Sequence, residues 1–305
     1  MHTGVILSTT SGWKSSRRIF ENINTKRAIL DQRVVIGGKS IIKRFNDTDF
    51  TKFQELDSFS YDKNIILIRY GTTASVKCSK NILTVYNTAK AIELASSKKL
   101  ARVTLENAGI AVPKIITEGN PDNVYPLIAR NDFHERGEDL YVCRDVDAYQ
   151  LAIKAGFTYI SELYPRTREF RVHCAHGKIL MIHEKPMPTD VSDIRKCVDG
   201  FNNEDWEYVY WRDYDAEICK IALDATKALG LDFAGVDVMA FPSQDGYPRQ
   251  VVCEVNTAPT LYKYGSEKYA EYFDWLFRSE KPRDHFDYTT IKKADKFAWR
   301  SEEFK

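Results

Sequence analysis

Two strand-like segments that flank one turn constrain the fold of this 305-residue chain more than any other feature. Residues 232–241 read DFAGVDVMAF and residues 249–256 read RQVVCEVN, and both are rich in β-branched and small apolar residues. Asp245-Gly246, between them, is a pair that favours a two-residue hairpin turn. The sequence therefore predicts an antiparallel pair of strands here.

Polar residues inside these segments predict a site at one end of the sheet. With the turn at Asp245-Gly246, Asp237 faces Glu254 across the strands, and Asn256 lies on the same face as Glu254 because side chains alternate. Two carboxylates and an amide oxygen suit Mg²⁺ held on nucleotide phosphates. The alternative is that Glu254 pairs with Arg249 or Arg195, and that Asn256 caps a turn.

Composition excludes several functional classes. The formal net charge is +1, so no bulk charge favours a nucleic-acid partner or a membrane surface, and local basic grooves stay open as the weakest alternative. The six cysteines are scattered, so neither a zinc site nor a disulfide scaffold is expected. No apolar run approaches the length of a membrane span, and residues 1–20 do not have the pattern of a signal peptide. We expect a protein of the cytoplasm.

The remaining segments predict an α/β fold. The first ~95 residues indicate a small α/β unit with strands at 4–9, 33–38 and 64–71. Asn87 is a candidate cap for one helix, Ser96 or Ser97 for a second helix that ends at Gly109. Further predicted elements are short strands within 114–165, a hairpin at 169–185 turning at His176-Gly177, and an amphipathic helix at 215–230.

The segments GVDVM and CEVNTAPTL together resemble the closing signature of ATP-grasp ligases of the RimK-like and D-alanine–D-alanine ligase-like group. The N-terminal segments IRYG and YNTAKAIELASSKKLA resemble phage-type carboxylate–amine ligases. The resemblance implies an ATP-grasp fold in three parts. These are a pre-ATP-grasp domain at 1–95, a small ATP-grasp subdomain with flap and hinge at 96–165, and a large subdomain with the metal and phosphate site at 166–305.

The resemblance also implies roles for individual residues in holding ATP. Arg130 takes the place of a strand lysine that touches the phosphates, and Lys99 or Lys98 approaches the nucleotide from the following helix. The expected flap, around 131–139, has His134 and only one glycine, Gly137. The adenine and ribose contacts are assigned to Glu162, the main chain of Leu163 and Tyr164, and Glu169.

The reaction implied by the resemblance joins a carboxylate to an amine of an amino acid, peptide or protein terminus. ATP first converts the carboxylate to an acyl-phosphate, with Mg²⁺ or Mn²⁺ on Asp237, Glu254 and Asn256. Arg171 reaches phosphate or acyl-phosphate, and Arg195 with Lys185 stabilises the developing charge. A homodimer fits the family. The alternatives are a phosphotransferase, a protein-modifying ligase and a non-catalytic nucleotide-binding module.

Overall fold

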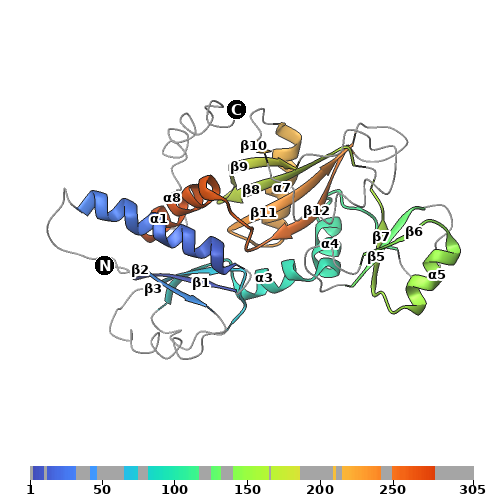
Figure 1. Ribbon diagram of the computed structural model, residues 1–305, viewed down its shortest axis with the longest axis horizontal. Coiled ribbons are helices and arrows are strands. Elements are labelled where there is room, and N and C mark those ends of the chain that lie inside the picture. The colour runs from blue at the N-terminus through green and yellow to red at the C-terminus, as the bar shows by residue number, and fades with distance from the viewer. Residues whose placement is uncertain are drawn as a thin grey trace.

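The structure is a computed structural model, and it describes residues 3–9, 12–31, 42–46, 65–74, 82–116, 125–131, 140–164, 166–185, 209–210, 215–241 and 249–278 (Figure 1). The predicted strand at 33–38, the Asp245-Gly246 turn and the tail from 279 lie outside these residues. Within the described part, no helix has the length and apolar run that crossing a membrane requires.

The N-terminal sheet is parallel and has the strand order β2-β1-β3-β4. Its strands are β1 (Thr3–Ser8), β2 (Ile42–Asn46), β3 (Ile65–Tyr70) and β4 (Ile82–Tyr86), so the strands predicted at 4–9 and 64–71 are present. All six residues of β3 are buried, which agrees with the continuous apolar run expected of a parallel strand covered on both faces. Helix α1 (Trp13–Asp31), which was not predicted, packs against α8 (Lys263–Arg278).

Two helices follow the N-terminal sheet, α3 (Ala89–Ser96) and α4 (Lys98–Asn107). Ser97 caps α4 as predicted, whereas Thr88 and not Asn87 caps α3. Asn87 has a φ of 57°, in the left-handed region, and its side chain is bonded to Asp232 and Phe233 instead. The prediction of an Asn87 cap is therefore wrong, because a distant partner occupies the side chain.

A small sheet with the strand order β6-β5-β7 comes next along the chain. It contains β5 (Leu127–Arg130), β6 (Tyr141–Cys143) and β7 (Tyr159–Glu162), and α5 (Val146–Lys154) packs on it. The strands match segments that were predicted, but α5 was not predicted. Figure 1 shows this small sheet at one end of the molecule, joined to the rest beside α4.

The large sheet has the strand order β10-β9-β8-β11-β12. Its strands are β8 (Arg168–Ala175), β9 (Lys178–Lys185), β10 (Val209–Tyr210), β11 (Phe233–Ala240) and β12 (Gln250–Asn256). The hairpin of β8 and β9 turns at His176-Gly177 as predicted, and both turn residues have positive φ. Helix α7 (Ala216–Ala228) is the predicted amphipathic helix, capped by Asp215.

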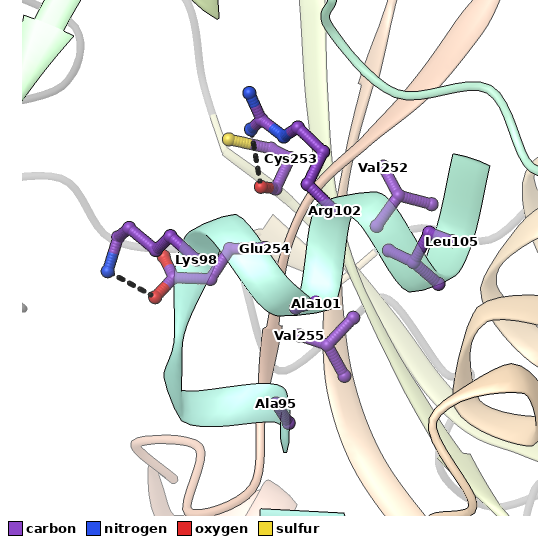
Figure 2. A pocket seen from close by; sticks show the side chains of 9 residues that line it. All are labelled: Ala95, Lys98, Ala101, Arg102, Leu105, Val252, Cys253, Glu254 and Val255. Atoms are coloured by element: carbon purple, nitrogen blue, oxygen red, sulfur yellow. Dashed lines mark hydrogen bonds and ion pairs between the residues drawn. The ribbon is translucent and has the colours of Figure 1, made fainter. Parts of the chain in front are cut away.

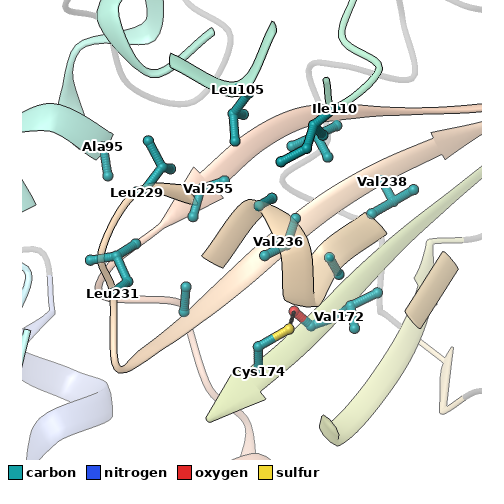
Figure 3. Close-up of a cluster of buried hydrophobic side chains, with 14 of the residues drawn as sticks. Ala95, Leu105, Ile110, Val172, Cys174, Leu229, Leu231, Val236, Val238 and Val255 are labelled. Atoms are coloured by element: carbon teal, nitrogen blue, oxygen red, sulfur yellow. Dashed lines mark hydrogen bonds between the residues drawn. The ribbon is translucent and has the colours of Figure 1, made fainter. Parts of the chain in front are cut away.

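One face of the large sheet is apolar and forms the main core. Val172, Val236 and Val255 point from it toward α4 and α7, where they meet Leu105 and Leu229 (Figure 3). Because side chains alternate along each strand, the intervening residues point to the opposite face. That opposite face holds the polar residues. The fold is α/β, as predicted, and the described residues form one parallel and two antiparallel sheets. The three-part division of the chain stays a prediction.

Candidate active site

A row of charged side chains crosses the polar face of the large sheet. Arg171 on β8 lies opposite Asp237 on β11, which in turn lies opposite Glu254 on β12. In the neighbouring row Gly235 lies opposite Asn256. The structure thus has the pairing of Asp237 with Glu254 that the sequence predicts, and Asn256 lies beside them.

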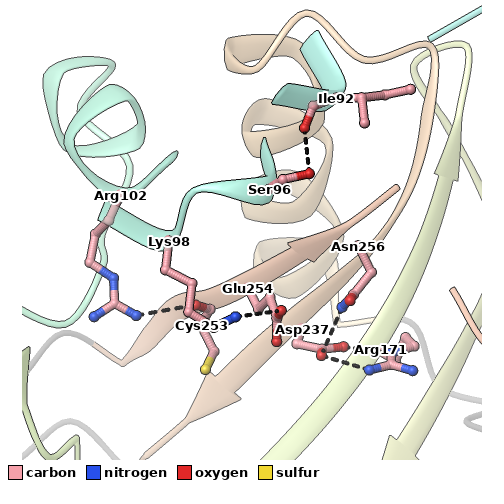
Figure 4. A network of polar contacts seen from close by, with 9 residues as sticks. All are labelled: Ile92, Ser96, Lys98, Arg102, Arg171, Asp237, Cys253, Glu254 and Asn256. Carbon is pink, nitrogen blue, oxygen red and sulfur yellow. Dashed lines mark hydrogen bonds and ion pairs between the residues drawn. The ribbon is translucent and has the colours of Figure 1, made fainter. Parts of the chain in front are cut away.

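Asp237 is held by Arg171 and Asn256. The Nε and Nη2 atoms of Arg171 donate to the two carboxylate oxygens of Asp237 at 2.7 and 2.8 Å, a bidentate pair (Figure 4). The Nδ2 atom of Asn256 donates to Oδ2 of Asp237 at 3.2 Å. Only 8% of the Asp237 side chain is exposed, so these bonds offset the cost of burying a carboxylate.

Glu254 pairs with a lysine from α4. The Lys98 Nζ atom lies 3.4 Å from Oε1 of Glu254. The alternative partner Arg249 is ruled out, since it pairs with Glu217 and Asp215 on the surface. A helix turns about 100° per residue, which places Lys99 on the exposed side of α4. Lys98 is therefore the lysine of this helix that lies at the site.

The two carboxylates differ in their electrostatics. Burial raises the pKa of Asp237, against the opposing effect of Arg171. Burial also acts to raise the pKa of Glu254, but Lys98, Arg171 and Arg130 outweigh it and lower that pKa below its usual value. Glu254 is thus held as a carboxylate by surrounding positive charge, which would equally attract the phosphates of a nucleotide.

The donor set fits a hard divalent cation. Two carboxylates and one amide oxygen are available on one face, although Arg171 occupies both oxygens of Asp237 and would have to share them. Among the described residues no three His, Cys, Asp or Glu side chains gather in one group. The predicted set therefore depends on the amide of Asn256 as its third ligand.

Arg130 adds a buried positive charge at the end of β5. It is 8% exposed, and its guanidinium carbon lies 5.3 Å from the centre of the Tyr159 ring on β7. Its Nε atom is buried and has no hydrogen-bond partner among the described residues. A buried guanidinium with an unused donor fits an anionic ligand.

Solved structures share this architecture. The D-alanine–D-alanine ligase of Bacillus anthracis, in complex with ATP, has a TM-score of 0.58 and 17% identity, with 99% of each chain covered. The chain has the ATP-grasp fold. The ATP-grasp ligase PsnB, in complex with a minimal precursor, Mg and ADP, has a TM-score of 0.60 and 13% identity, with 88% of this chain and 96% of PsnB covered.

An ATP-grasp protein with a RimK domain from Sphaerobacter thermophilus has a TM-score of 0.55 and 12% identity, with 88% of this chain and 98% of that chain covered. No protein-family model and no curated protein matches the chain. At these identities the similarity establishes the ATP-grasp fold alone.

The segment predicted to hold adenine leaves the small sheet at the end of β7. Oε2 of Glu162 accepts from the Lys114 N–H at 3.3 Å, and burial raises the pKa of Glu162. The Leu163 N–H donates to the Pro126 carbonyl at 3.0 Å, and the Tyr164 carbonyl accepts from the Arg166 N–H. These backbone groups are engaged by the protein itself, so adenine would have to use the other polar groups of Leu163 and Tyr164.

Glu169, the predicted ribose ligand, lies on the same face of β8 as Arg171. It is 7% exposed and forms an ion pair with the buried Arg166 at 3.0 Å. Lys185 ends β9 opposite Glu169 in the ladder, and its side chain is outside the described part. His134, Gly137 and Arg195 also lie outside the described residues, so their predicted roles stay predictions.

Sequence reasoning missed two residues next to this site, Arg102 on α4 and Tyr159 on β7. Arg102 is 3% exposed and lies 5.2 Å from the Tyr159 ring centre. A signal was present, because Arg102 shares the α4 face of Ala101 and Leu105, where a charge is unexpected.

Proposed function

We propose that this protein is an ATP-dependent carboxylate–amine ligase that forms an amide or peptide bond through an acyl-phosphate. The observation that carries the proposal is the row Arg171, Asp237 and Glu254 on an ATP-grasp fold, with Lys98 and Arg130 beside it. Paired carboxylates surrounded by three cations match the needs of a metal-bound nucleotide triphosphate.

In the proposed reaction the γ-phosphoryl group of ATP passes to a substrate carboxylate oxygen and ADP leaves. An amine nitrogen then attacks the acyl carbon, loses a proton, and expels inorganic phosphate. Such chemistry needs positioning and charge stabilisation and no protein nucleophile. Mg²⁺ on Asp237, Glu254 and Asn256 would neutralise the β- and γ-phosphates.

The chain's own cations would bind and orient the nucleotide. Arg130 and Lys98 would hold phosphate oxygens, and Arg171, at the β8 end of the row beside Asp237, would reach the transferred group. The roles assigned to Arg195 and Lys185, and closure of the 131–139 flap to exclude water, complete the proposal. Phage origin, a cytoplasmic location and a homodimer also belong to it.

The test is an ADP-release screen over amino acids and small peptides with Mg²⁺, followed by mass spectrometry of the product. Hydroxylamine should trap a hydroxamate from the acyl-phosphate. ADP release with a phosphorylated product and no hydroxamate would favour a phosphotransferase instead. Calorimetric ATP binding without turnover over the whole panel would favour a non-catalytic module.

A further inference from the structure

Arg102 connects three parts of the protein through one buried guanidinium. Its Nη2 atom donates to the carbonyl of Cys253 on β12 at 3.1 Å (Figures 2 and 4). Its Nη1 atom lies 3.4 Å from the Pro113 carbonyl. The same guanidinium lies over the ring of Tyr159 in the small sheet. Arg102 therefore touches the large sheet, the segment after α4, and the small sheet.

The Cys253 carbonyl belongs to an irregularity in β12. Val252 faces Val238 and Glu254 faces Asp237, so Cys253 is an extra residue on its strand, as in a β-bulge. A bulge re-aims the side chains that follow it, and the residue that follows here is Glu254. Arg102 holds the backbone at the point where the direction of Glu254 is set.

The segment after α4 is attached to the same point. The Val252 N–H donates to the Ala111 carbonyl at 2.9 Å, two residues before the Pro113 carbonyl that Arg102 contacts. Figure 2 shows the Arg102 guanidinium beside Cys253 and Lys98 beside Glu254, so that two side chains of α4 meet two neighbouring residues of β12. These bonds fix α4 and the following segment to the bulge.

Tyr159 carries the connection to Arg130. The guanidinium carbons of Arg102 and Arg130 lie 5.2 and 5.3 Å from the centre of its ring. Tyr159 also faces Arg130 in the ladder of the small sheet. One ring thus positions both guanidinium groups.

We infer that Arg102 is a positioning residue that sets the spacing between the Arg130 guanidinium and the Glu254 carboxylate. A metal–nucleotide complex must contact both groups together, phosphate at Arg130 and metal at Glu254, so their spacing decides how well it binds. A metal-free nucleotide needs only the cations. This inference rests on the proposed function, because it takes a metal-bound nucleotide as the ligand.

The experiment measures the binding of a non-hydrolysable ATP analogue by calorimetry, once with excess Mg²⁺ and once with EDTA. Loss of a group that orients a metal ligand typically costs 10- to 100-fold in metal affinity. Mg²⁺ should increase the affinity of the wild type for the analogue, and we expect Arg102→Met to reduce this increase, the Mg²⁺ gain, by about tenfold or more. Its affinity for the metal-free analogue should stay near the wild-type value. Arg102→Lys, which keeps the charge but has one compact donor group, should restore part of the gain.

Controls separate positioning from general damage. Arg249→Met removes an arginine with a 61% exposed side chain and should change neither affinity. Tyr159→Phe keeps the ring and should match the wild type, whereas Tyr159→Leu should shift the Mg²⁺ gain in the same direction as Arg102→Met. Thermal unfolding of each variant shows whether it is folded, and if Arg102→Met is not, Arg102→Lys and Tyr159→Leu provide the measurement.

Equal weakening of both complexes by the Arg102 variants, or no weakening of either, would overturn the positioning role while leaving the proposed function intact. Absence of analogue binding to the wild-type protein under both conditions would instead overturn the proposed function, and the inference with it.

Discussion

Arg171 donates two hydrogen bonds to Asp237, at 2.7 and 2.8 Å, so that the guanidinium covers both oxygens of this carboxylate. Asp237 and Glu254 face each other on adjacent strands, and two like charges at that spacing repel. Arg171 and Lys98 offset this repulsion from either side. Because a divalent cation would compete with Arg171 for Asp237, binding of a metal-bound nucleotide should release the guanidinium toward the phosphates.

Removing either carboxylate charge should abolish turnover. We expect Asp237→Asn and Glu254→Gln each to lower ADP release by about 10²–10³-fold, the scale seen when one charge-stabilising group is lost. Glu254→Gln should keep a melting temperature close to that of the wild type. Asp237→Asn leaves the largely buried Arg171 without its charged partner and should lower the melting temperature, so ADP release is measured at a temperature at which every variant is folded. Asp224→Asn, on the exposed side of α7, is the matched control. Normal ADP release by either site variant would rule out the metal assignment.

The neighbouring lysines of α4 should behave differently. Lys98→Met removes the cation beside Glu254 that is proposed to hold a phosphate oxygen of ATP. Hydrogen bonds to charged groups contribute about 1.5–3 kcal/mol, so KM for ATP should rise roughly tenfold or more. Lys99→Met, on the exposed side of the helix, should leave KM unchanged. Steady-state ADP release gives KM for ATP in both variants. A larger increase in KM for Lys99→Met than for Lys98→Met would show that Lys99 contacts the nucleotide.

Asn87 should be essential for attaching the N-terminal sheet to β11. Its side chain makes three hydrogen bonds with the backbone of Asp232 and Phe233, at 2.8–3.2 Å. Asn87→Ala should lower the free energy of unfolding by about 2–4 kcal/mol through these bonds. Asn87→Gly, which tolerates the positive φ, should be about 1 kcal/mol less destabilising. Urea unfolding measures the free energy of unfolding of both variants. Equal losses of stability would show that alanine adopts the positive φ at position 87 without a cost relative to glycine.

His183 should make stability depend on pH. Burial, with a smaller effect of Arg171, lowers the pKa of His183 to about 3. Its pKa in the unfolded chain is near 6.5, so below that pH the unfolded state binds the proton first. Stability is fully present above about pH 6.5 and should fall by up to about 1.4 kcal/mol per pH unit below it, down to about pH 3.

A His183→Gln variant isolates this effect. Urea unfolding between pH 7.5 and 5 should show a shallower loss of stability for the variant than for the wild type. The measurement stays above the usual pKa values of carboxylates, so they contribute little. Parallel curves for the two proteins would show that His183 does not carry the pH dependence.

Local patterns were sufficient for the hairpin that carries the site. The Asp-Gly turn signal predicts the two antiparallel strands, and alternation along a strand places Glu254 and Asn256 on one face; both are properties of the backbone. The cap at Ser97 and the end of α4 near Gly109 were likewise readable from neighbouring residues. The register of the two strands was not readable: the predicted turn would pair Ala240 with Val251, whereas Ala240 pairs with Gln250. The extra residue at Cys253 shifts the register by one, and this bulge is what brings Glu254 opposite Asp237.

Helices built from aromatic and polar residues were not found. Helix α8 contains Tyr269, Tyr272 and Phe273, all fully buried, and such residues have only modest helix propensity. Its stability comes from packing against α1 and against aromatic residues of other elements, such as Tyr70 and Phe233. Propensity is a weak guide where tertiary packing supplies the free energy.

The sequence by itself determined that Glu254 and Asn256 share one face of a strand and what ligand chemistry they suit, because strand periodicity places side chains with no reference to the rest of the chain. The bulge at Cys253 brings Asp237 opposite Glu254. Only the tertiary structure decided which cations meet them. The packing of helices and sheets decides that Lys98, rather than Lys99 or Arg249, pairs with Glu254. It also decides that Arg171 pairs with Asp237 and that the buried Arg102 binds the backbone at Cys253. Charge pairing acts through space, between residues that lie far apart along the chain.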